Sequence, residues 1–140
     1  MITEDYCSPE VAKLLEENGF REYCEAIYFI LENGDYRWSK IDIPIRDCST
    51  CKPTAILCPT HQMAMKWLRE VHNLCIAPYA AAYRYGFTID KCDTGSNICN
   101  DDVINEELIT FEKAVDAALK YALENLSSLT NIFNNSKLNF

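Results

Sequence analysis

The residues best suited to chemistry lie in one short stretch in the middle of the chain. It reads Cys48-Ser-Thr-Cys51, then six residues, then Cys58-Pro-Thr-His61. Three thiolates and one imidazole are a donor set of closed tetrahedral zinc sites. A zinc-stabilised module that uses Cys48, Cys51, Cys58 and His61 is therefore one hypothesis. The short spacer and the high apolar content of the chain favour a second hypothesis, in which the stretch is a loop followed by the start of a helix. We therefore predict no metal and no cofactor.

A small thiol-dependent enzyme is a further alternative. The chain has two histidines, so a Cys–His pair would have to join Cys58 or Cys75 to His61 or His72. A reactive cysteine also needs a lowered pKa, for example at a helix N-terminus, and the prolines around the CxxC pair disfavour a helix there. The sequence contains no phosphate-binding glycine loop and no HExxH motif. We therefore predict a protein without catalytic residues.

Composition limits the class of protein and its partners. The chain has 140 residues, of which 49% are hydrophobic, which is typical of one folded domain. Its net charge of −8 disfavours binding to nucleic acid or to an anionic membrane surface. The start of the sequence has no basic and apolar leader, and no apolar run reaches the roughly 18 residues of a membrane span. We expect a cytoplasmic protein whose eight cysteines are free thiols.

Caps and apolar periodicity predict three helices. The first begins after Ser8, a good N-cap, and closes at Gly19. The second covers about residues 60–73, with Thr60 as its N-cap, and the third begins near Thr110. The apolar stripe of the second helix consists of Ala64, Trp67, Leu68, Val71 and Cys75.

The strands are predicted from β-branched and aromatic runs between turn residues. They cover residues 26–31, 36–43, 54–57, 79–89 and 96–103. Asn33-Gly34 predicts a two-residue hairpin loop, and Pro44 marks the end of a pairing or an edge strand. In residues 79–89 large apolar residues alternate with others, which indicates one long strand with a single buried face.

The predicted order of elements is α-β-β-(β)-α-β-β-α. Hairpins dominate, which favours the α+β class, with a mostly antiparallel sheet and about three helices packed on one face. Residues 1–129 are predicted to form a single α+β domain, and residues 130–140 a polar C-terminal tail.

Three segments carry a resemblance to a known family. They are Met1-Ile-Thr-Glu-Asp-Tyr-Cys-Ser8, Cys58-Pro-Thr-His-Gln-Met-Ala-Met-Lys-Trp-Leu-Arg-Glu-Val-His72 and Thr110-Phe-Glu-Lys-Ala-Val-Asp-Ala-Ala-Leu-Lys-Tyr-Ala-Leu-Glu-Asn-Leu126. They resemble small proteins of gut Bacteroides-type bacteria and of their phages and mobile elements. That family has no established activity, so it assigns no role to any residue. The resemblance implies a cytosolic bacterial or phage accessory protein.

The sequence favours action through protein–protein interaction. It combines an acidic composition and eight tyrosines with no catalytic constellation. We therefore predict a non-enzymatic protein that binds an unknown protein partner or forms a homo-oligomer, with neither nucleic acid nor membrane as a partner.

Overall fold

The computed structural model describes residues 2–130. Backbone contacts divide the chain into two compact units, Met1–Ala64 and Met65–Phe140. Each unit contains one three-stranded antiparallel sheet, so the predicted α+β class is confirmed, although the strands form two sheets and not one. The single domain over residues 1–129 stays a prediction. Of the predicted tail, residues 131–140 lie outside the described residues.

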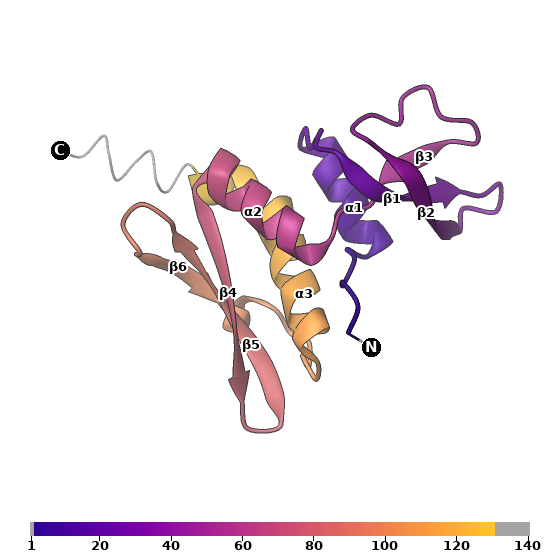
Figure 1. Ribbon diagram of the computed structural model, residues 1–140. Helices are drawn as coiled ribbons and strands as arrows, with labels where there is room; N and C mark the ends of the chain where they lie inside the picture. Colours follow the sequence, from indigo (N-terminus) through magenta and orange to yellow (C-terminus); the bar gives the residue numbers. More distant parts are fainter. Residues whose placement is uncertain (1, 131–140) are drawn as a thin grey trace. The chain divides into compact units, whose positions relative to one another are not determined.

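The first unit combines one helix with the sheet β2-β1-β3 (Figure 1). Its elements are α1 (Pro9–Glu17), β1 (Cys24–Ile30), β2 (Tyr36–Ile45) and β3 (Ala55–Leu57). The Ser8 hydroxyl caps α1 by accepting the Val11 N–H at 3.3 Å, and Gly19 follows the helix with φ +90°. The helix buries Val11, Ala12 and Leu15 and packs against β3. The predicted first helix and its caps are confirmed.

The hairpin between β1 and β2 has a longer loop than the sequence predicts. The Leu31 N–H donates to the Asp35 carbonyl at 2.8 Å, so three residues lie between the paired ends. Gly34 has φ +87° and occupies the left-handed position that closes such a loop. Asn33-Gly34 is therefore not a two-residue loop, although the hairpin itself is confirmed.

The ladder between β1 and β2 is interrupted near its end. Ala26 pairs with Lys40, but Cys24 pairs with Ile45. A step of two residues along β1 therefore corresponds to a step of five residues along β2. Pro44 lies in this irregular part of β2, which is an edge strand, and the edge position predicted for Pro44 is confirmed.

The second unit contains the sheet β4-β5-β6 with α3 packed on β4 and β5 (Figure 1). Its elements are β4 (Leu74–Ala81), β5 (Arg84–Lys91), β6 (Asn97–Asn100), the short 3-10 helix η1 (Asp101–Val103) and α3 (Phe111–Glu124). The Thr110 hydroxyl caps α3 by accepting the Lys113 N–H at 3.1 Å. The buried face of α3 consists of Ala114, Val115, Ala118, Leu119, Ala122 and Leu123.

The prediction of one long strand over residues 79–89 is wrong. Ala81 pairs with Arg84, so the segment is a hairpin with Ala82 and Tyr83 in its loop. Tyr83 is fully exposed and has φ +63°, a value usually taken by glycine or asparagine. The turn carries neither residue, which is why the alternating pattern concealed it. One consequence is that Tyr79, which pairs with Gly86, lies on the opposite face of the sheet from Phe87.

Helix α2 (His61–His72) contains the boundary between the two units and carries part of the predicted stripe. Ala64, Trp67 and Leu68 are buried, as predicted. Val71 is 57% exposed and Cys75 lies in β4, so both assignments are wrong. The helix ends at His72 and Asn73 takes φ +58°, which turns the chain before Cys75 can continue the stripe. In the part of the chain that the structure describes, no helix has the length and apolarity needed to cross a membrane.

Candidate binding pocket

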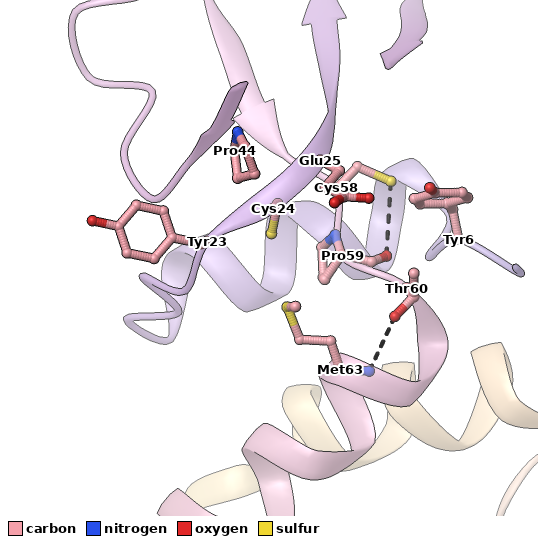
Figure 2. Close-up of a pocket in the computed structure, with 9 residues that line it drawn as sticks. All are labelled: Tyr6, Tyr23, Cys24, Glu25, Pro44, Cys58, Pro59, Thr60 and Met63. Atoms are coloured by element: carbon pink, nitrogen blue, oxygen red, sulfur yellow. Dashed lines mark hydrogen bonds between the residues drawn. The ribbon is translucent and has the colours of Figure 1, made fainter. Parts of the chain in front are cut away.

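A pocket of about 280 Å³ opens in the first unit, beside the interrupted end of the β1–β2 ladder (Figure 2). Apolar side chains form most of its wall, and one of the nine lining residues, Glu25, carries a charge. Figure 2 shows the Met63 side chain extending from α2 toward Cys24. The lining residues are Tyr6, Tyr23, Cys24, Glu25, Pro44, Cys58, Pro59, Thr60 and Met63.

Backbone hydrogen bonds fix the wall formed by Cys58, Pro59 and Thr60. The Cys7 N–H donates to the Pro59 carbonyl at 3.0 Å, and the Cys58 N–H donates to the Ala26 carbonyl at 3.0 Å. A separate bridge pairs Tyr6 with Thr60. This segment is therefore held from two sides, which gives the pocket a preformed wall.

Thr60 joins this wall to α2. Its hydroxyl accepts the Met63 N–H at 3.2 Å (Figure 2), which confirms the predicted N-cap. The His61 N–H donates to the Asp5 carbonyl at 2.9 Å, which anchors the start of the helix to the N-terminal segment. The cap therefore sets the direction in which Met63 enters the pocket.

The two thiols of the pocket, Cys24 and Cys58, are both buried. Burial, followed by the neighbouring Cys58 thiol and then Glu22, raises the pKa of Cys24 to about 12. The Cys58 thiol donates to the carbonyls of Cys7 at 3.5 Å and Pro59 at 3.9 Å, the second of which is drawn in Figure 2. A thiol in such surroundings packs as a small apolar group and is a poor nucleophile.

The rim of the pocket is more polar than its wall. Tyr23 is 58% exposed, and the Arg46 guanidinium lies 5.7 Å from the centre of its ring, within range of a cation–π contact. Glu25 is exposed, so its carboxylate stands at the mouth and not in the wall. The arrangement is an apolar cavity with a charged edge, which suits an apolar group attached to a polar chain.

The structure does not bring together the four residues of the zinc hypothesis. Within residues 2–130, no group of three or more His, Cys, Asp or Glu side chains is placed to hold a metal ion. Cys58 lies in the buried segment between β3 and α2, and His61 is the first residue of α2, whereas Cys48 and Cys51 lie in the loop between β2 and β3. The stretch is thus divided into two parts, as the loop hypothesis expects.

The other residues of the thiol-enzyme hypothesis lie in the second unit. Burial, followed by the neighbouring Cys75 thiol, raises the pKa of Cys92. The His72 ring packs edge-on against Trp67, with ring centres 4.8 Å apart, and burial lowers its pKa. Burial therefore outweighs the stabilisation that the C-terminal end of a helix gives to a cation.

Sequence reasoning missed most of the pocket. It singled out Cys58 and Thr60, but it gave Tyr6, Tyr23 and Met63 no role. The cavity lies where the β1–β2 ladder is interrupted near Pro44. The sequence shows a proline at this position, but it does not show how many residues of β2 are left unpaired there.

Comparison with protein families, with curated proteins and with solved structures gave no match to this chain.

Proposed function

We propose that the chain is a non-enzymatic protein-interaction module that binds an extended segment of a partner protein. One apolar side chain of that segment would occupy the pocket of the first unit. The observation that carries the proposal is the preformed apolar wall of this pocket, with its charged rim.

The size of the pocket supports a single large side chain as its occupant. A volume of about 280 Å³ lies near the lower limit of ligand pockets, which begins at about 300 Å³. Burying roughly 200 Å² of an aromatic side chain contributes about 5 kcal/mol. Association itself costs about 4–15 kcal/mol, so one anchor does not suffice and the partner needs further contacts.

The outer edge of β2 offers those contacts. This strand has ten residues, and among the described strands β1 alone pairs with it. Trp38 and Ile43 on β2 are exposed, and Pro44 of the same strand lines the pocket. A segment that pairs with this edge would gain backbone hydrogen bonds, and it would place one side chain near the pocket.

The state of the thiols supports binding and not covalent chemistry. Since the pKa of Cys24 is raised to about 12, almost none of this thiol is ionised at neutral pH. The Thr60 hydroxyl is engaged in capping α2. The reactive groups of the pocket thus serve its structure.

The proposal includes a cellular setting and a class of partner. The resemblance to bacterial and phage proteins and the eight free cysteines support a cytoplasmic accessory protein. The net charge of −8 favours a protein partner over nucleic acid or an anionic membrane. Glu25 at the rim favours a basic residue beside the apolar anchor.

Peptide selection followed by calorimetry tests the proposal. A random peptide library should yield binders that share one large apolar residue, with a negative heat-capacity change on binding. Cys24→Met should fill the pocket and weaken binding at least about tenfold, a loss of about 1.4 kcal/mol. The matched control Cys92→Met, at an exposed thiol, should leave affinity within about twofold.

Two results would contradict the proposal. One is equal peptide affinity in Cys24→Met and in the unchanged protein, with both shown to be folded by circular dichroism. The other is a stable dimer by light scattering together with no selected peptide, which would favour self-association.

A further inference from the structure

The eight cysteines include three neighbouring pairs, and only one pair has a backbone suited to a disulfide. Burial and then the neighbouring Cys51 thiol raise the pKa of Cys48, and burial and then the neighbouring Cys75 thiol raise the pKa of Cys92. Cys24 and Cys58 are close enough for each thiolate to disfavour the other. All eight are free thiols in the structure.

Cys48 and Cys51 stand at the two ends of a tight turn. The Cys51 N–H donates to the Cys48 carbonyl at 3.0 Å across the turn residues Ser49 and Thr50. Such a turn holds its end Cα atoms within about 7 Å of each other. A disulfide needs Cα atoms about 4.4–6.8 Å apart, so this backbone can accept the bond with little movement.

A side-chain contact steadies the same turn. The Asp47 carboxylate accepts the Ser49 N–H at 2.8 Å and the Ser49 hydroxyl at 3.0 Å. The backbone and then the side-chain hydrogen bond of Ser49 lower the pKa of Asp47, so the carboxylate keeps both contacts at neutral pH. The turn is thus held by contacts that do not involve either sulfur.

The other two pairs are diagonal neighbours across antiparallel strands. The Cys92 N–H donates to the Asn73 carbonyl at 3.1 Å, which places Cys92 opposite Asn73 and two residues away from Cys75. The Cys58 N–H donates to Ala26, two residues from Cys24, in the same way. Diagonal neighbours have Cα atoms about 7–8 Å apart, beyond the usual range of a disulfide.

We propose that Cys48 and Cys51 form a reversible dithiol–disulfide site that reacts with low-molecular-weight disulfides of the glutathione class. The proposal rests on the turn that holds the two cysteines at its ends and on the Asp47–Ser49 contacts that steady it, and it does not depend on the pocket or its partner.

The reaction proceeds by two thiol–disulfide exchanges. Cys51, the more exposed of the two, loses its proton and attacks one sulfur of the small disulfide, RSSR. The S–S bond breaks, one RS⁻ leaves and takes up a proton, and a Cys51–SR mixed disulfide remains. Cys48 then loses its proton and attacks the Cys51 sulfur, and the second RS⁻ leaves and is protonated. The protein gives up two electrons and two protons, and RSSR becomes two RSH.

The surroundings of Cys48 favour the oxidised product. Cys48 is 7% exposed, and burial, followed by the Cys51 thiol, raises its pKa to about 12. Ionisation of Cys48 therefore stabilises the reduced form very little. A disulfide formed from a thiol with a high pKa is harder to reduce than one formed from a thiol with a low pKa. The same burial makes the second exchange slow, because few Cys48 thiols are ionised at neutral pH.

The test is a disulfide map of the native protein. Reduced protein is incubated with oxidised glutathione, alkylated with N-ethylmaleimide in acid, digested and analysed by mass spectrometry. We expect the Cys48–Cys51 link in most molecules, and the Cys75–Cys92 and Cys24–Cys58 links in less than about a tenth. Excess dithiothreitol should restore both thiols.

Two variants sharpen the result. Cys48→Ser should stop at the first exchange and accumulate glutathione on Cys51, whereas Cys75→Ser should leave the Cys48–Cys51 link unchanged. The inference is overturned if the unchanged protein accumulates the same Cys51 adduct as Cys48→Ser without forming the link. It is also overturned if Cys75–Cys92 forms as readily as Cys48–Cys51. Because the map of the unchanged protein decides both points, a variant that fails to fold does not obscure the answer.

Discussion

The Tyr79 hydroxyl donates a 2.6 Å hydrogen bond to Asp101, and this contact joins β4 to η1 across the intervening β5. Asp101 also accepts the Arg84 guanidinium at 3.0 Å and the Phe87 N–H at 3.3 Å. Burial opposes the charge of Asp101, but the hydrogen bonds from Tyr79 and Arg84 outweigh it and hold the pKa below its usual value. The same bond raises the pKa of Tyr79.

Asp101→Asn should destabilise the protein by about 1–3 kcal/mol, because it weakens a carboxylate bonded to three donors. Urea unfolding at pH 7 measures the loss, and Asp102→Asn, at an exposed neighbour, is the control. The folded pKa of Asp101 is lowered from 3.8, so its contribution is present above pH 3.8 and disappears as pH falls through the folded value. If the difference in unfolding free energy between Asp101→Asn and the unchanged protein stayed the same below the folded pKa, this assignment would be contradicted.

Gly86→Ala should destabilise the protein by about 1–3 kcal/mol through overpacking. A Cβ at Gly86 would stand 2.5 Å from Cζ and the hydroxyl oxygen of Tyr79 and 2.7 Å from Asp101. Tyr79→Ala removes the first obstacle, so the two changes should not be additive in a double-mutant cycle. Additive losses in thermal unfolding would show that the Tyr79 ring does not restrict this position.

Tyr83→Asn should stabilise the β4–β5 hairpin by up to about 1 kcal/mol, since asparagine tolerates a left-handed backbone better than tyrosine. Tyr83 is fully exposed at φ +63°, so the change loses little buried surface. Chemical denaturation gives the sign. Tyr83→Val, which is β-branched, should shift stability in the opposite direction, and a gain in that variant would disprove the strain.

His72 should make the stability of the protein depend on pH near neutrality. Its Nε2 atom is buried and has no hydrogen-bond partner within residues 2–130, and burial lowers its pKa from 6.5. Below pH 6.5 the unfolded chain therefore binds more protons than the folded one, and stability falls as pH drops through the folded pKa. His72→Gln should flatten the wild-type stability curve between pH 7 and 5, and an unchanged slope would refute the role of His72.

Trp67→Ala should cost about 3–5 kcal/mol, the loss expected for truncating a buried aromatic side chain. Trp67 is 7% exposed, whereas Val71 on the same helix is 57% exposed. Val71→Ala is therefore the matched control and should change stability by less than about 0.5 kcal/mol. A loss below about 1 kcal/mol for Trp67→Ala would show that this ring is not part of the core.

Local signals in the sequence predicted the helices well and the sheets less well. The three predicted N-caps are confirmed at Ser8, Thr60 and Thr110. An N-cap can be predicted from sequence because it joins residues only three positions apart. The sequence did not predict the turn at Ala82-Tyr83, because neither residue favours a turn conformation. The pairing of β4 with β5 along the whole hairpin stabilises this turn.

The candidate site depends on longer-range geometry than the helices do. The pocket combines residues from the N-terminal segment, two strands and the start of α2. The turn between Cys48 and Cys51 is local, but their neighbourhood includes Glu16 of α1, which no spacing in the sequence indicates.

The uneven ladder between β1 and β2 has a consequence for how this protein can change over evolutionary time. A shift of one residue in a regular ladder turns every side chain to the other face. Here the surplus residues of β2 are taken up between Lys40 and Ile45, beside the pocket. Insertions and deletions in that interval can therefore reshape the pocket mouth while Tyr28 and Trp38 keep their pairing. The irregular end of the ladder can thus change in length without disturbing the regular pairing of the rest.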